Sequence, residues 1–151
     1  MNMNTQAVLF EAINAMEERG WAPASDVSRA TKQSVSITKA WQNRLIARNP
    51  RQFKAEVPIG RRFNEKIDIV DVVNGIAYEL KLSSKNPHHE FFKDVFKVIV
   101  YNKYHKSKLK TFAFISEESA AKILQRGLGK EAIEMVRGLG VSVEFPCFIC
   151  H

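Results

Sequence analysis

The chain has 151 residues, 45% of them hydrophobic, which suffices for one compact domain with an ordinary buried core. Its 23 lysines and arginines outnumber 16 acidic residues and leave a formal net charge of +7, which favours polyanionic partners, nucleic acid foremost. No apolar run approaches the roughly 18 residues that span a bilayer, and glutamates interrupt the first apolar stretch, so we expect a cytoplasmic protein with no membrane partner. The two cysteines, Cys147 and Cys150, are too few for a four-cysteine zinc site, and we expect reduced thiols.

The N-terminal third of the chain has helical periodicity. Residues 5–19 place apolar side chains on one stripe that ends at Gly20, which predicts a packing helix. Trp41 has helical spacing in a later segment, and we assign it to the core because a single tryptophan in such a pattern is more often buried than exposed.

The segment from Asp26 resembles a helix-turn-helix unit. It predicts a short helix to Thr31, a turn near Lys32 and Gln33, and a longer helix over 34–48, although Lys32 stands where such units usually carry glycine. The second helix would present to DNA the polar residues Gln33, Ser34, Ser36, Lys39, Asn43 and Arg44. The alternative is an amphipathic surface helix that only packs on the core. We therefore predict a helical segment, 1–50, and a β-rich core, 51–151, which shares the helix 34–48.

After Asn49 the hydrophobic period changes from about 3.6 to 2, which predicts strands. The first strand covers 52–59. Two further runs rich in β-branched residues, 66–73 and 76–82, are joined by Asn74 and Gly75, a pair typical of a two-residue type I′ turn. The prediction is three consecutive antiparallel strands.

A two-residue turn implies a definite register. Val73 would pair with Ile76, Asp68 would face Lys81, and Glu79 would lie diagonally across from Asp68. The three charged side chains then share one sheet face, with the two carboxylates close enough to hold one hard cation. The simpler interpretation is a cross-strand ion pair on a solvated face with Glu79 as an ordinary surface acid. Apolar neighbours on that face favour a metal or catalytic site.

The segment that follows the predicted hairpin reads as a helix. Asn86 and Pro87 predict the helix start, and the apolar positions of the helix are Phe92, Val95, Phe96 and Ile99.

The rest of the chain predicts two strands with a helix between them. The strands cover 109–116 and 141–148, and the helix is capped by Ser116 and interrupted at Gly127 and Gly129. The whole order indicates an α+β fold with three layers, in which helices flank a mixed sheet.

In this order of elements, the sequences KIDIV and YELKL resemble the PD-(D/E)xK motif of the restriction-endonuclease-like nucleases. The resemblance covers residues 34–116, with Asp68 on the second strand and Glu79, Leu80 and Lys81 on the third; an isoleucine stands in place of the motif's proline. Many members carry a further acid on the preceding helix. Gln42 is the nearest polar residue there, and Glu56, or more remotely Glu11, could take that role.

The resemblance implies a Mg²⁺-dependent endonuclease that hydrolyses DNA, with Mn²⁺ as a substitute for Mg²⁺. Asp68, Glu79 and the backbone carbonyl of Leu80 would bind the metal, while Lys81 would orient or deprotonate a water. Phosphate contacts would come from Arg61, Arg62, Lys85, Lys93, Lys97, Lys103, His105, Lys106, Lys108 and Lys110, some of which belong to an ordinary solvated surface.

Three functions remain open from the sequence. The first is an endonuclease acting on double-stranded or branched DNA, with a homodimer as one way to supply two cuts. The second is a catalytically silent DNA-binding or regulatory protein on a nuclease-like scaffold, and the third is an RNA-targeting nuclease. The presence of Asp68, Glu79 and Lys81 together favours the first, because a scaffold needs no such set.

Overall fold

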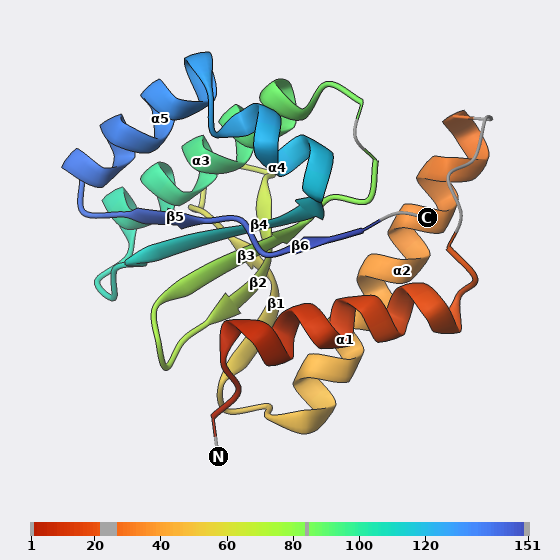
Figure 1. Ribbon diagram of the computed structural model, residues 1–151. Helices are drawn as coiled ribbons and strands as arrows, with labels where there is room; N and C mark the ends of the chain where they lie inside the picture. Colours follow the sequence, from red (N-terminus) through yellow and green to blue (C-terminus); the bar gives the residue numbers. More distant parts are fainter. Residues whose placement is uncertain (1, 22–26, 84, 150–151) are drawn as a thin grey trace.

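The computed structural model describes residues 2–21, 27–83 and 85–149, and Figure 1 shows a mixed sheet with helices on both faces. The helices are α1 (Thr5–Glu18), α2 (Val27–Arg48), α3 (Pro87–Tyr104), α4 (Glu118–Leu124) and α5 (Gly127–Gly138). The strands are β1 (Phe53–Pro58), β2 (Lys66–Asp71), β3 (Ile76–Leu80), β4 (Thr111–Glu117), β5 (Ser142–Glu144) and β6 (Cys147–Phe148). Within the described ranges, no helix combines the length and the apolar character that crossing a membrane requires.

The sheet is antiparallel at one side and parallel at the other. Its order is β1-β2-β3-β4-β5, with β6 also paired to β4. The meander β1-β2-β3 is antiparallel, whereas β3, β4 and β5 run parallel, so the chain must cross over between β3 and β4 and does so through α3. The predicted mixed α+β class with helices flanking the sheet is confirmed.

Two hydrophobic cores lie on opposite faces of the sheet. Because successive residues of a strand point to opposite faces, β4 sends Ala113 and Ile115 to the core under α1 and α2, and sends Phe112 and Phe114 to the core under α3 and α5. Trp41 is fully buried in the first core, where its indole nitrogen donates to the carbonyl of Val8 at 3.2 Å. The prediction that Trp41 is a core residue is confirmed.

The predicted helix-turn-helix is wrong, because α2 continues through Lys32 and Gln33 without a turn. Both residues favour helix, and no glycine or proline interrupts the segment. Gln33 is half-buried, and its side chain donates to the carbonyl of Gly20 at 3.0 Å. The start of the predicted first helix, at Asp26, lies outside the described residues.

The predicted two-residue turn between β2 and β3 is also wrong. Asp71 pairs with Ile76, so residues 72–75 form a four-residue connection and Val73 pairs with nothing in the ladder. A type I′ turn requires a positive φ at both of its central residues. Gly75 has a positive φ of 68°, but Asn74 does not have a positive φ.

The buried carboxylate of Asp71 explains this wider turn. It accepts hydrogen bonds from the backbone nitrogens of Val73 and Asn74 at 3.0 and 2.9 Å, and from the side chain of Gln52 at 2.8 Å. A side chain that caps the turn in this way replaces the tight backbone turn inferred from Asn74 and Gly75. The register moves by two residues, which places Asp68 opposite Glu79 instead of opposite Lys81.

The buried side of α3 agrees in part with the predicted one. Val95 is buried and Phe92 and Ile99 pack against the core as expected, but Phe96 is 66% exposed. Phe91, Val98, Asp94 and Lys97 also belong to the buried side, so the predicted apolar positions did not define all of it.

The helix predicted from Ser116 is two helices, α4 and α5, and Ser116 is not their cap. Ser116 belongs to β4, and its hydroxyl donates to the carbonyl of Glu117 at 3.1 Å. The predicted interruption is present, since Gly127 has a φ of +54°. A Cβ at Gly129 would lie 1.9 Å from the carbonyl oxygen of Leu124, so only glycine allows this close approach.

We expect Asp71→Ala to lower the free energy of unfolding by about 3 kcal/mol, because it leaves the buried side chain of Gln52 and the backbone donors of the turn without their acceptor. Val73→Ala in the same turn is the control, since Val73 is 51% exposed and should change stability by less than about 0.5 kcal/mol. Urea denaturation measures both variants. Equal stabilities would show that Asp71 does not hold the turn.

Candidate active site

The ladder between β2 and β3 ends just before the motif residues. The last pair of the ladder is Ile69 with Tyr78, and beyond it Asp68 turns its carboxylate into the gap between the strands. One carboxylate oxygen of Asp68 accepts the backbone N–H of Leu80 at 3.0 Å, while the backbone N–H of Asp68 points to Glu79 Oε1 at 3.4 Å. The two strands therefore separate here and bring two acids together.

Glu79 is buried beside a lysine. Its exposed fraction is 1%, and Lys97 Nζ lies 2.5 Å from its Oε1. Among the described residues, the other oxygen, Oε2, has no hydrogen-bond partner. A buried carboxylate oxygen without a donor is costly, which marks this position as one that needs a cation or a water.

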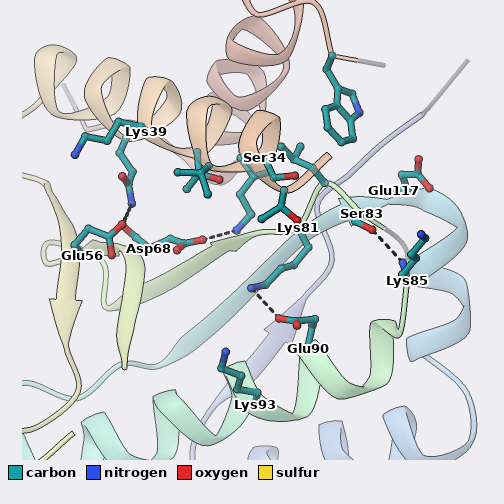
Figure 2. A pocket seen from close by; sticks show the side chains of 17 residues that line it. Ser34, Lys39, Glu56, Asp68, Lys81, Ser83, Lys85, Glu90, Lys93 and Glu117 are labelled. Atoms are coloured by element: carbon teal, nitrogen blue, oxygen red, sulfur yellow. Dashed lines mark hydrogen bonds and ion pairs between the residues drawn. The ribbon is translucent and has the colours of Figure 1, made fainter. Parts of the chain in front are cut away.

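Lys81 points toward α3 and not across the strands. Its ammonium group lies 3.3 Å from Glu90 and 3.2 Å from Asp94, and Figure 2 shows its side chain extending toward Glu90. Asp94 also contacts Lys97 at 3.1 Å. The predicted ion pair between Asp68 and Lys81 on a solvated face is therefore not the arrangement found.

Burial and neighbouring charges shift the ionisation of this cluster. Burial, with the adjacent charges of Asp68 and Asp94, raises the pKa of Glu79 well above its usual value. Burial also raises the pKa of Asp94. Burial alone would lower the pKa of Lys81, but the surrounding carboxylates, Asp94 foremost, outweigh it and raise that pKa. Lys81 is therefore a cation at neutral pH and not a free base.

Glu56 joins the site from β1. The side chain of Gln42, on α2, donates to Glu56 Oε1 at 3.1 Å and to the carbonyl of Asp68 at 2.9 Å, and Glu56 and Asp68 lie next to each other in Figure 2. Glu56 has a φ of +50°, an uncommon conformation for a residue with a side chain. Such backbone strain is often kept where a side chain has a task.

These residues open into a groove of about 880 Å³ between α2, the end of β3 and the start of α3. Its acidic lining includes Glu56, Asp68 and Glu90, and its lysines are Lys39, Lys81, Lys85 and Lys93. Glu79 does not line the groove, because it is buried beneath it.

The structure gathers some of the predicted site residues in this groove and leaves others elsewhere. The predicted site residues that line the groove are Glu56, Asp68, Leu80, Lys81, Ser34, Lys39, Lys85 and Lys93. The groove is not lined by Gln33, Asn43, Arg61 or Arg62. Glu11, the remoter alternative for an extra acid, is buried between α1 and α2, where it pairs with Arg44 at 2.7 Å and Arg48 at 2.6 Å. Lys97 was expected to reach phosphates but is buried within the acidic cluster.

Sequence reasoning missed Asp94 as a site residue, and it placed Lys97 at a phosphate and not in the buried cluster. Both lie in a helix whose apolar positions were taken as its only buried side. A signal was present, since Glu90, Asp94 and Lys97 recur at spacings of four and three and so occupy one helix face.

A divalent cation fits this cluster in one respect and not in another. Four carboxylates, those of Asp68, Glu79, Glu90 and Asp94, face two ammonium groups, so the formal charge of the cluster is negative, and Glu79 Oε2 lacks a partner. However, no three histidine, cysteine or acidic side chains in the described part of the chain are arranged to hold a metal by themselves. A Mg²⁺ ion, which needs only one or two carboxylates, would have to take its other ligands here from water and phosphate.

No family model, curated protein or solved structure matches this chain.

We expect Lys97→Met to lower the free energy of unfolding by about 3–5 kcal/mol, because it leaves Glu79 and Asp94 buried without their shared cation. Lys93→Met on the same helix is the matched control, since Lys93 is exposed and should change stability by less than about 0.5 kcal/mol. Thermal and urea unfolding measure both. Similar losses in the two variants would contradict a structural role for the Lys97 ion pairs.

Proposed function

We propose that this protein is a Mg²⁺-dependent endonuclease that hydrolyses DNA phosphodiester bonds and has a restriction-endonuclease-like core. The observation that carries the proposal is the convergence of Asp68, Glu79 and Lys81 at the point where β2 and β3 separate. The PD-(D/E)xK resemblance of the sequence and the excess of positive charge support it.

The groove suits a nucleic-acid strand. Lys39 on one wall and Lys85 and Lys93 on the other are exposed cations that can neutralise phosphates on either side of the acidic residues. A phosphate held between them would lie beside Asp68 and Lys81.

Asp68 and Glu79 would hold the metal, with the Leu80 carbonyl as a further ligand, as the motif implies. When bound, Mg²⁺ supplies positive charge to the phosphate oxygens and makes a neighbouring water more acidic. Lys97 holds Oε1 of Glu79 and leaves Oε2 for the cation.

In the reaction, the oxygen of a water forms a bond to phosphorus, and one of the two P–O ester bonds breaks. Lys81, as a cation, donates hydrogen bonds to the oxygens on which negative charge develops. Glu56 is the exposed carboxylate beside Asp68, and we assign to it the acceptance of the water's proton. The departing oxygen takes up a proton from solvent.

One observation favours a second candidate, a catalytically silent DNA-binding protein. Lys97 and Lys81 already neutralise much of the acidic charge, and a protein that never binds metal needs such internal compensation. The two functions differ in whether Mg²⁺ enters the cluster.

Incubation with supercoiled plasmid tests the catalytic proposal. We expect Mg²⁺-dependent nicking by the wild type, no nicking with EDTA, and a loss of at least about 100-fold for Asp68→Asn and for Lys81→Ala. Lys130→Ala and Glu134→Gln, both on the exposed side of α5, are the matched controls and should retain wild-type rates. DNA binding without nicking under any condition would favour the silent protein, and cleavage of RNA alone would reject DNA as the substrate.

Metal binding can be tested without turnover. At a Mg²⁺ concentration about ten times the dissociation constant, the melting temperature should rise by about 3–6 °C, because the cation binds only the folded state. Asp68→Asn should abolish the rise, and Glu134→Gln should keep it. An equal rise in Asp68→Asn would place the cation elsewhere.

A further inference from the structure

A pair of exposed aromatic rings lies at the other end of α3 from the groove. Phe63, in the loop between β1 and β2, and Tyr104, the last residue of α3, have ring centroids 6.1 Å apart with their planes tilted by 47°. Their exposed fractions are 40% and 56%. Two contacting rings that remain this exposed present an apolar surface to a partner.

The local backbone builds this pair. The N–H of Phe63 donates to the carbonyl of Gly60 at 3.3 Å, which closes a turn with Arg61 and Arg62 at its apex. A Cβ at Gly60 would come within 3.1 Å of the Phe63 ring, so glycine gives the ring room to fold back toward Tyr104. The turn therefore exposes two arginines beside the two rings.

The surroundings of the rings are strongly basic. Residues 59–66 and 101–110 contain seven lysines and arginines and one acid, Glu65. Lys103 Nζ lies 5.2 Å from the Tyr104 ring centroid. Lys108 donates hydrogen bonds to the backbone carbonyls of Asn102 and His105, so we leave it out of the patch. We call the exposed set the aromatic-cationic patch: Arg61, Arg62, Phe63, Lys103, Tyr104 and Lys106.

We propose that the aromatic-cationic patch binds a single-stranded segment of the DNA substrate. Arginines and lysines bind phosphates, and exposed aromatic rings stack on bases that have no pairing partner, which is the combination that single-strand-binding surfaces use. A continuous duplex keeps its bases stacked and offers nothing to the rings. The proposal deepens the nuclease function and rests on it for the identity of the bound polymer.

The position of the patch predicts where the unpaired segment lies. Asp94, which contacts Lys81, and Tyr104 are ten residues apart on one helix, roughly 15 Å at about 1.5 Å per residue. This span corresponds to about four nucleotides at about 3.4 Å each along a strand. The preferred substrate therefore has unpaired bases about four nucleotides from the phosphate in the groove.

Fluorescence anisotropy in EDTA tests the patch without cleavage. The probes are a blunt duplex and the same duplex with a single-stranded tail of about six nucleotides. The wild type should bind the tailed DNA about tenfold more tightly, and Tyr104→Ala and Phe63→Ala should each remove most of that difference. Tyr104→Phe keeps a ring and should keep the preference. Arg61→Ala should weaken binding of the tailed DNA and reduce its salt dependence.

Phe96→Ala is the matched control, because Phe96 is an exposed aromatic residue of α3 outside the patch and should leave the preference unchanged. Equal wild-type affinity for the two probes, or a preference that survives in correctly folded Tyr104→Ala, would overturn the proposal. Plasmid nicking is scored separately. A protein that prefers tailed DNA but never cleaves it would refute the nuclease function and leave the patch in place, whereas cleavage without tail preference would do the reverse.

Discussion

The buried contact between Glu79 and Lys97 is the interaction on which the rest of the site depends. A carboxylate at 1% exposure is costly to bury without a cation beside it, and Lys97 is that cation. Lys97 also donates to the backbone carbonyl of Lys66 at 2.8 Å, so it joins the start of β2, the end of β3 and the middle of α3. This link, together with the apolar packing of α3, holds the helix against the sheet and so supports the wall of the groove.

The contact between Glu79 and Lys97 is compatible with both candidate functions, the nuclease and the catalytically silent DNA-binding protein. Asp94 lies between two lysines, one of which, Lys81, opens into the groove while the other, Lys97, is buried. The buried lysine, Lys97, pairs with both Glu79 and Asp94. The groove lysine is held as a cation by acids of α3, which makes it a ready partner for a phosphate but a poor base.

The parts of the fold that could be predicted from sequence are those encoded by local pattern. The change from a helical period to a period of two located the β-meander, and Pro87 located the start of α3. The two errors at turns have local causes as well. Asn74 and Gly75 suggested a tight turn, but the carboxylate of Asp71 accepts hydrogen bonds from the turn backbone and stabilises a wider one. In α2, a short polar stretch suggested a break, although its residues favour helix and the helix continues.

The sequence by itself determined the proximity of Asp68, Glu79 and Lys81, because a register shift of two residues keeps every side chain on its own face of the sheet. Only the tertiary structure decided the partners of these groups. Asp94 and Lys97 reach them by a crossover through α3, and Phe63 meets Tyr104 across 41 positions of the chain. Contacts of this kind depend on how a helix is rotated and placed on a sheet. The packing of the two surfaces against each other determines this placement, and the periodicity of either segment alone does not.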